Sequence, residues 1–212
     1  MTSDIKFLHE VPHIRAGLDY LLAHDPVFKT LKIDYGRFDW VYMGTDFSAL
    51  VRIVAGQQVS TGAAKAIFQC ISDAVSPMSP ENLLAVEEDT LRACGFSVSK
   101  VNYVRGAAQA IVSGVLDLES LNAKNAEDVT AEITALKGFG PWSAQCYLMF
   151  CLARPDIWVA GDLGIQEGLR RYLGADTRPD AAQTLAAHEK FAPHGTAASL
   201  LLWYMKGDKD LA

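Results

Sequence analysis

Apolar residues recur every three or four positions along most of the chain, which is the spacing of one face of an α-helix. In residues 14–28, one such face is predicted to carry Ile14, Leu18, Leu21 and Leu22. The same spacing marks eight further segments, at residues 47–55, 62–75, 100–112, 125–136, 142–151, 163–173, 179–191 and 197–206. We find no alternating run rich in β-branched residues, which would indicate a strand. The pattern predicts an all-α protein of roughly ten helices.

Side chains that can accept hydrogen bonds from a first helical turn precede several of these segments. They are Asp46, Ser60 or Thr61, Ser79 (followed by Pro80), Asp89, Ser99, Asn125 and Asp162. Each is predicted to be an N-cap. Pro80 and Pro141 suit the first helical position, where a missing N–H costs nothing.

The stretch "ALKGFGPWSA" (135–144) places Gly138, Gly140 and Pro141 within four residues, between two helical segments. Two glycines there allow a tight turn with positive φ, and they leave several backbone N–H groups unpaired. Such groups form an anion-binding site together with the dipole of the next helix. The alternative is an ordinary connection between two helices.

The composition is that of a folded globular protein, because 50% of the 212 residues are hydrophobic and 21% are charged. The densest apolar run, "SLLLWYM" (199–205), is far too short to span a membrane. The N-terminus has no apolar stretch of the kind found in signal peptides. We therefore expect a cytoplasmic protein.

The four cysteines, Cys70, Cys94, Cys146 and Cys151, form no CxxC pair, and the histidines show no ligand spacing. Cys146 and Cys151 fall in an apolar helix and are expected to be small buried side chains. The expectation is a reduced protein without zinc or an iron–sulfur cluster.

The net charge of −6 argues against a polyanionic partner, but acidic residues are absent from three long segments. Residues 47–72, 90–116 and 133–155 hold seven of the 19 basic residues and none of the 25 acidic ones. A surface that faces a polyanion would show this distribution. Burial of the same segments in the core would also remove acids, so both interpretations stand.

Asp162 directly precedes a predicted helix at 163–173. As a plain N-cap it needs no further role. A helix N-terminus also favours the ionised carboxylate by about 0.3–1 kcal/mol, which suits a residue that must stay anionic.

Together these elements resemble the helix–hairpin–helix (HhH-GPD) DNA glycosylases. The likeness rests on "LKGFGPWSA" (136–144), followed at a fixed distance by "VAGD" (159–162). Residues 47–67 resemble the helix–turn–helix of the 3-methyladenine DNA glycosylase II branch, and residues 191–207 resemble its closing helix. The likeness covers about residues 12–207.

The resemblance implies an all-α, two-lobed fold with a cleft between the lobes and without the N-terminal β-domain of some relatives. Residues 1–212 would form a single glycosylase domain. One lobe would contain residues 1–45 and about 160–212, and the other about 46–159 with the hairpin.

The resemblance also implies roles for individual residues. Asp162 matches the catalytic aspartate, and Gln58 falls where the family places the wedge that fills the gap left by a flipped nucleotide. The hairpin would hold a DNA phosphate through the backbone of Lys137, Gly138, Phe139 and Gly140. A structural sodium or potassium ion would bind the backbone carbonyls of Thr134, Leu136 and Phe139, and no cofactor is required.

Aromatic residues are candidates for the walls of the base pocket. Trp142 and Trp203 come first, followed by Trp40 and Tyr204, and core packing is the alternative for each. Cys146 stands where the alkylpurine branch often has an aromatic residue, which implies a shallower pocket. Gly195 likewise replaces an arginine often seen near the last helix.

Trp142 occupies the position at which strand-cleaving members of the superfamily carry a lysine. Without that amine no Schiff base forms, so strand cleavage by β-elimination is not expected. The four-cysteine cluster loop of the endonuclease III branch is also missing from the sequence.

One well-placed carboxylate is enough for an alkylated purine, although ordinary glycoside hydrolysis uses two. A base such as 3-methyladenine or 7-methylguanine is already cationic and leaves as a neutral molecule, so no general acid is needed. We expect a monofunctional DNA N-glycosylase that acts as a monomer on damaged double-stranded DNA in base excision repair, with no membrane partner. The alternatives are a non-catalytic DNA-binding module in which Asp162 only caps a helix, and a monofunctional glycosylase for oxidised or mismatched purines.

Overall fold

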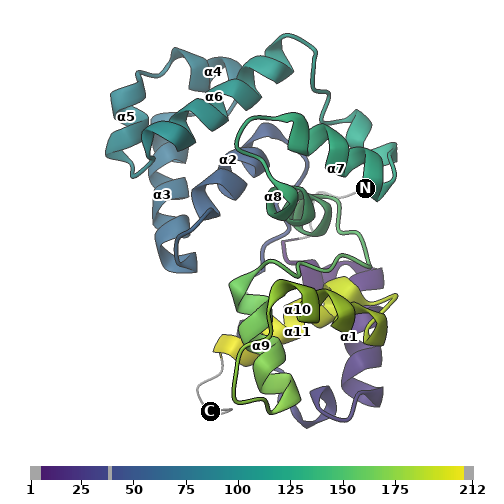
Figure 1. Ribbon diagram of the computed structural model, residues 1–212. Helices are drawn as coiled ribbons and strands as arrows, with labels where there is room; N and C mark the ends of the chain where they lie inside the picture. Colours follow the sequence, from purple (N-terminus) through teal and green to yellow (C-terminus); the bar gives the residue numbers. More distant parts are fainter. Residues whose placement is uncertain (1–5, 38–39, 208–212) are drawn as a thin grey trace. The chain divides into compact units, whose positions relative to one another are not determined.

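The computed structural model describes residues 6–37 and 40–207. It consists mostly of helices joined by loops (Figure 1). Within these residues, extended pairing is limited to one isolated antiparallel bridge, between Phe7 and Val41. The all-α prediction is therefore confirmed. No helix in the described part of the chain is long and apolar enough to cross a membrane.

The chain divides into two compact units, of which the first is discontinuous in sequence. Unit 1 combines residues 1–42 with residues 148–212, and unit 2 is the continuous stretch 43–147. The resemblance assigned residues 148–159 to the lobe that contains the hairpin, whereas in the structure they belong to unit 1.

Unit 1 contains η1 (Leu8–Glu10), α1 (Pro12–His24), η2 (Phe28–Thr30), η3 (Tyr35–Arg37), α9 (Leu163–Leu173), α10 (Ala181–Ala186), η6 (Ala187–Lys190) and α11 (Gly195–Gly207). Unit 2 contains α2 (Phe47–Gly56), α3 (Thr61–Ala74), α4 (Pro80–Ala85), α5 (Glu88–Ala93), α6 (Val98–Val112), η4 (Ser120–Ala123), α7 (Ala126–Ala135) and α8 (Pro141–Cys146). The chain leaves α8 through a π-helical turn, η5 (Tyr147–Cys151).

Most of the predicted helix starts are correct. The side chains of Asp46, Ser60, Ser79, Asn125 and Asp162 each accept a hydrogen bond from the first turn of the helix that follows. Each therefore satisfies N–H groups that the helix itself leaves unpaired.

Two predicted helix starts are each wrong by two residues. Helix α5 begins at Glu88, so Asp89 lies inside its first turn. Helix α6 begins at Val98 because the hydroxyl of Ser97, not that of Ser99, accepts from the backbone N–H of Lys100. The sequence offers two serines two positions apart, and the spacing of apolar residues cannot choose between them.

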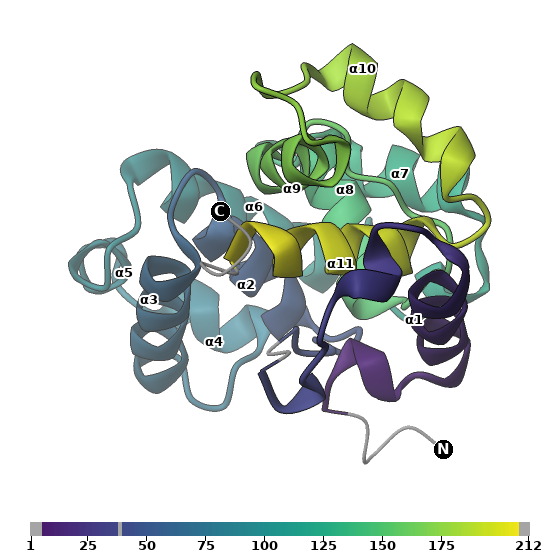
Figure 2. The same ribbon diagram turned by 90° about the horizontal axis from the view of Figure 1, so that it is seen from below.

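The core of unit 1 is built where α11 packs against both α9 and α1 (Figure 2). Helices α9 and α11 approach closely at Gly168, where an added Cβ would lie 2.2 Å from the backbone oxygen of Leu202. A glycine is required at this point because no side chain fits between the two backbones. The rings of Phe28, Tyr172 and Phe191, which lie far apart in the sequence, pack on one another with centroids 4.9–5.7 Å apart.

In unit 2, a disulfide joins Cys70 of α3 to Cys94 at the end of α5. One turn earlier on α3, Ile67 packs against Gly95, where an added Cβ would lie 3.0 Å from the Ile67 side chain. The expectation of a fully reduced protein is therefore wrong for these two cysteines. They are 24 residues apart and carry no local motif, so only the packing of α3 on α5 brings them together. Among the described residues, Cys146 and Cys151 form no disulfide, and both are buried, as predicted.

Candidate functional site

Asp162 is held by three N–H donors in unit 1. Its Oδ1 atom accepts from the backbone N–H of Gly164 (2.7 Å) and of Ile165 (3.0 Å), at the start of α9. The same oxygen accepts from the indole N–H of Trp203 on α11 (2.9 Å). The side chain is half-buried. Asp162 is therefore an N-cap, and its carboxylate is also fixed in orientation by a second helix.

Two glycines on α9 allow Trp203 to reach this carboxylate. At Gly164, an added Cβ would lie 2.8 Å both from Asp162 Oδ1 and from Trp203 Nε1. One turn later, Gly168 permits the close approach of the α11 backbone described above. The spacing Asp162–Gly164–Gly168 thus builds one face of α9 on which the indole ring lies against the carboxylate.

Trp203 was predicted to be a wall of the base pocket, and the structure gives it an additional contact that the sequence does not reveal. Besides donating to Asp162, its ring stacks on that of Phe150, with centroids 5.8 Å apart. Phe150 was not among the predicted residues. A single sequence carries no signal for either contact, since Trp203 is 41 residues from Asp162.

The two weaker pocket candidates of unit 1 have contacts with the N-terminal segment. The hydroxyl of Tyr204 donates to the backbone carbonyl of Lys32 (3.1 Å), and the backbone carbonyl of Trp40 accepts from Leu8 (3.0 Å). Gly195 stands where relatives often have an arginine. Its N–H donates to Asp156 (2.9 Å), and an added Cβ would lie 2.6 Å from the same carboxylate. A larger residue therefore does not fit here.

The predicted hairpin forms in unit 2 between α7 and α8. The N–H of Leu136 bonds to the carbonyl of Ile133 (3.2 Å), and the N–H of Phe139 bonds to the carbonyl of Leu136 (3.0 Å). Gly138 has φ of +87°, which only glycine adopts freely, and the ring of Tyr103 lies directly against it. Pro141 takes the first position of α8, as predicted. Lys137 is exposed and Phe139 is buried.

The second hairpin glycine is different. Gly140 is the N-cap residue of α8, with φ of −92° and ψ of −174°, and an added Cβ would meet nothing within 4 Å. The expectation that both glycines provide a positive φ is therefore correct for Gly138 and wrong for Gly140. Gly140 is instead exposed, and the space beside its backbone is open.

Gln58 lies at the exposed tip of the loop between α2 and α3, and its backbone is left-handed (φ 57°). The preceding residue, Gln57, was not predicted to matter. Its side-chain Nε2 donates to the carbonyl of Gly138 (2.9 Å) and to the hydroxyl of Ser143 (3.2 Å). The predicted wedge loop and the predicted phosphate hairpin are thus neighbours within unit 2.

Trp142 lies beside the base of the same loop, since an added Cβ on Gly56 would be 3.8 Å from its ring. Cys146, one turn further along α8, is buried. Neither position tests the predicted role in the base pocket, so for Trp142 and Cys146 that role stays a prediction.

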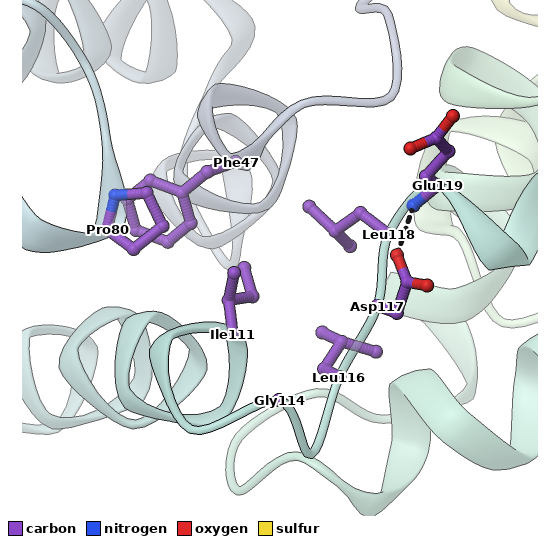
Figure 3. Close-up of a pocket in the computed structure, with 8 residues that line it drawn as sticks. All are labelled: Phe47, Pro80, Ile111, Gly114, Leu116, Asp117, Leu118 and Glu119. Carbon is purple, nitrogen blue, oxygen red and sulfur yellow. Dashed lines mark hydrogen bonds between the residues drawn. The ribbon is translucent and has the colours of Figure 1, made fainter.

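Two hollows lie within unit 2. The larger, of about 550 Å³, is mainly apolar and is lined by Phe47, Pro80, Ile111, Gly114, Leu116, Asp117, Leu118 and Glu119 (Figure 3). It contains none of the predicted site residues. The smaller, of about 250 Å³, is polar and is lined by Gln57, Gln58, Ser97, Ser99, Lys100 and Tyr103.

The carbonyls predicted to hold an alkali ion lie at the end of α7 and in the hairpin. A cation is favoured near the carboxyl end of a helix, where the last carbonyls lack intrahelical partners. The Leu136 carbonyl already accepts from Phe139, which leaves it one further lone pair. Among the described residues, no group of three or more His, Cys, Asp or Glu side chains could hold a metal ion.

An all-helical fold with a glycine-containing helix–hairpin–helix in one unit and a helix-capping aspartate in the other defines the class of helix–hairpin–helix proteins. The family described as "HhH-GPD superfamily base excision DNA repair protein" matches residues 51–194. The chain belongs to this family.

Individual relatives agree. The chain is 34% identical over 161 residues to the DNA-3-methyladenine glycosylase 1 of Schizosaccharomyces pombe, covering 74% of this chain and 71% of that protein. The solved structure of the S. pombe 3-methyladenine DNA glycosylase Mag1 in complex with abasic DNA superposes with a TM-score of 0.83, at 29% identity, over 92% of this chain and 98% of that chain. A DNA-3-methyladenine glycosidase from Bacillus halodurans gives a TM-score of 0.68 at 31% identity, over 90% and 89% of the two chains.

Proposed function

We propose that this protein is a monofunctional DNA N-glycosylase that excises alkylated purines, such as 3-methyladenine and 7-methylguanine, in base excision repair. The observation that carries the proposal is the carboxylate of Asp162, which two backbone N–H groups and one indole N–H fix in place. Membership of the HhH-GPD family and the names of the relatives supply the substrate class.

The chemistry assigned to Asp162 is electrostatic. Cleavage of the N-glycosidic bond develops positive charge on the sugar, and a preorganised carboxylate stabilises that charge. The oriented carboxylate also aligns the water that attacks the sugar. Because an alkylated purine leaves as a neutral base, one carboxylate is sufficient for the reaction.

The residues of unit 2 would bind and deform the DNA. The backbone of Lys137, Gly138, Phe139 and Gly140 would contact a phosphate, which positions the strand without reading its sequence. Gln58, exposed at the tip of its loop, would enter the base stack and fill the space left by the extruded nucleotide. A sodium or potassium ion on the carbonyls of Thr134, Leu136 and Phe139 would brace the hairpin. The enzyme would act as a monomer on double-stranded DNA.

The protein would release a base without cutting the strand. Trp142, at the start of α8, stands where a strand-cleaving relative has its lysine, and an indole cannot form a Schiff base. The product would therefore be an intact strand with an abasic site.

The test is chromatography of the bases released from methylated duplex DNA by the wild type and by Asp162→Asn. Asparagine still caps a helix, so the variant should fold and bind DNA while excision falls on the order of 100- to 1000-fold. Asp46→Asn is the matched control, because Asp46 is also an N-cap aspartate and accepts from Ser48 at the start of α2. A wild-type protein that binds DNA but releases no base would instead indicate a binding module.

A further inference from the structure

The left-handed backbone of Gln58 requires support from its surroundings. A residue other than glycine is unfavourable at φ of 57°, and it persists only where neighbouring contacts determine it. The Gln58 side chain is exposed and cannot provide that support by its own packing. The contacts that determine the loop must therefore come from adjacent residues.

Gln57 supplies a side-chain tie between the loop and the hairpin. Its amide group reaches the carbonyl of Gly138 and the hydroxyl of Ser143, so it contacts the hairpin on both sides of Pro141. Ser143 is buried, and Gly138 is the hairpin residue with positive φ. The residue next to the wedge is thus bonded to the turn that would hold the phosphate.

Lys100 supplies a second tie, to the backbone. Its Nζ donates to the carbonyls of Ala55 (3.1 Å) and Gln57 (2.9 Å), which are among the unpaired carbonyls at the end of α2. Burial lowers the pKa of the Lys100 ammonium. Lys100 of α6 therefore binds the loop that carries Gln58 through two of its backbone carbonyls.

The same helix also supports the hairpin. Tyr103 lies one turn after Lys100 on α6, and its ring packs on Gly138 so closely that an added Cβ would overlap it, at 2.2 Å. Helix α6 thus contacts both the backbone of Gln57 and that of Gly138. The Gln57 side chain joins these two points directly, through its hydrogen bond to the Gly138 carbonyl.

We propose that Gln57 is a positioning residue that fixes the Gln58 loop to the hairpin, so that phosphate binding and base extrusion act as one rigid unit. This inference rests on the proposed function, because it takes Gln58 as the wedge and the hairpin as the phosphate site. Extrusion requires the wedge to press into the stack while the strand is held, and a loop free to move relative to the hairpin would give way. Gln57 prevents that movement without touching the reacting atoms.

The test uses Gln57→Met, which keeps the side-chain length and removes both donors. Single-turnover excision is measured on a duplex with one 7-methylguanine opposite cytosine, and on the same strand with the lesion opposite an abasic site. Extrusion is easier in the second duplex because the lesion has no pairing partner. We expect the rate on the paired duplex to fall about tenfold, and the loss to be at least about threefold smaller opposite the abasic site.

Gln69→Met is the matched control, since Gln69 is an exposed glutamine of α3 whose side chain donates to Asp73, four residues away (2.8 Å). It should excise from both duplexes at the wild-type rate. Equal losses for Gln57→Met on the two duplexes, or no loss on either, would overturn the proposal. A wild-type protein that releases no 7-methylguanine from either duplex would instead overturn the proposed function itself.

A second variant covers the case in which Gln57→Met has no cooperative thermal transition. Lys100→Met removes the tie to the Gln57 backbone. It leaves the carbonyls of Ala55 and Gln57 without this donor, a cost that the loss of a partly buried charge offsets in part. The same selective loss on the paired duplex supports the proposal, and equal loss on both duplexes overturns it.

Discussion

The indole N–H of Trp203 and the backbone N–H of Gly164 donate to the same carboxylate oxygen of Asp162, from two different helices. The helix cap already holds this oxygen through the N–H groups of Gly164 and Ile165. The indole on α11 adds a third donor to the same oxygen, so the packing of α11 on α9 is part of the geometry of the site.

Trp203→Phe should lower excision while retaining DNA affinity. Phenylalanine keeps the stacking on Phe150 but loses the hydrogen bond to a charged group, which is worth about 1.5–3 kcal/mol. We expect the single-turnover rate to fall roughly 10- to 100-fold. Trp158→Phe serves as the control, because its indole donates to Thr184 (2.7 Å) and not to Asp162. A Trp203→Phe rate within about threefold of wild type would show that the cap suffices to orient the carboxylate.

The two hairpin glycines should respond differently to alanine. Gly138→Ala places a methyl group against the Tyr103 ring at positive φ, so the free energy of unfolding should fall by about 1–3 kcal/mol. Gly140→Ala should leave stability within about 0.5 kcal/mol of wild type but weaken binding to undamaged duplex, because its methyl group projects into open space. Urea unfolding and fluorescence anisotropy measure the two quantities. Unchanged affinity in Gly140→Ala would mean that DNA does not approach this face.

Excision should depend on the charge of the damaged base. A cationic methylpurine needs no proton to leave, whereas hypoxanthine must acquire one. We expect 3-methyladenine and 7-methylguanine to be released faster than hypoxanthine at pH 8, and the gap to narrow as the pH falls to 6. Single-turnover rates for both lesion classes across this range test the point. Faster release of hypoxanthine at pH 8 would instead require a general acid, a role that the ionised Asp162 does not fill.

The disulfide between Cys70 and Cys94 should stabilise unit 2. Closing a loop of this length is worth about 3 kcal/mol, so adding dithiothreitol should lower the urea midpoint of the wild type. Cys70→Ser should show the lower midpoint with or without reductant. The double variant Cys70→Ser/Cys94→Ser is the control and should be no less stable than the single one. A wild-type urea midpoint that is the same with and without dithiothreitol would show that this disulfide does not stabilise unit 2.

An ion-pair cluster on α9 should make stability depend on pH in the acid range. Hydrogen bonds from the guanidinium of Arg170, with a further contribution from Arg171, lower the pKa of Glu167. The cluster therefore contributes above the ordinary glutamate pKa of about 4.5, and its contribution is lost as the pH falls through the lowered value. Glu167→Gln should cost about 0.5–1 kcal/mol at pH 7. Denaturation at pH 7 and pH 3 should show a smaller difference from wild type at the lower pH.

Local features of this chain were predictable because they depend on neighbouring residues. The helix caps at Asp46 and Asn125 and the hairpin turn at Gly138 each involve groups within a few positions of one another. The same reasoning placed Asp162 at the start of α9.

The contacts that complete the site could not be predicted in this way. Trp203 meets Asp162 across 41 residues, and Gln57 meets Gly138 across 81. The pairing of Cys70 with Cys94 likewise depends on how α3 packs on α5, and the pattern of apolar residues predicts that a helix is amphipathic but not which partner it has. The open backbone at Gly140 shows the same limit at short range, since glycine alone does not specify the sign of φ.

The discontinuous make-up of unit 1 has a consequence for biosynthesis. Helix α1 is translated before unit 2, but α11, against which it packs, is translated after unit 2. Unit 2 is continuous and can complete its contacts while the chain is still growing. The nascent protein therefore passes through a stage in which all of unit 2 has been made, while α1 still lacks the helix against which it packs.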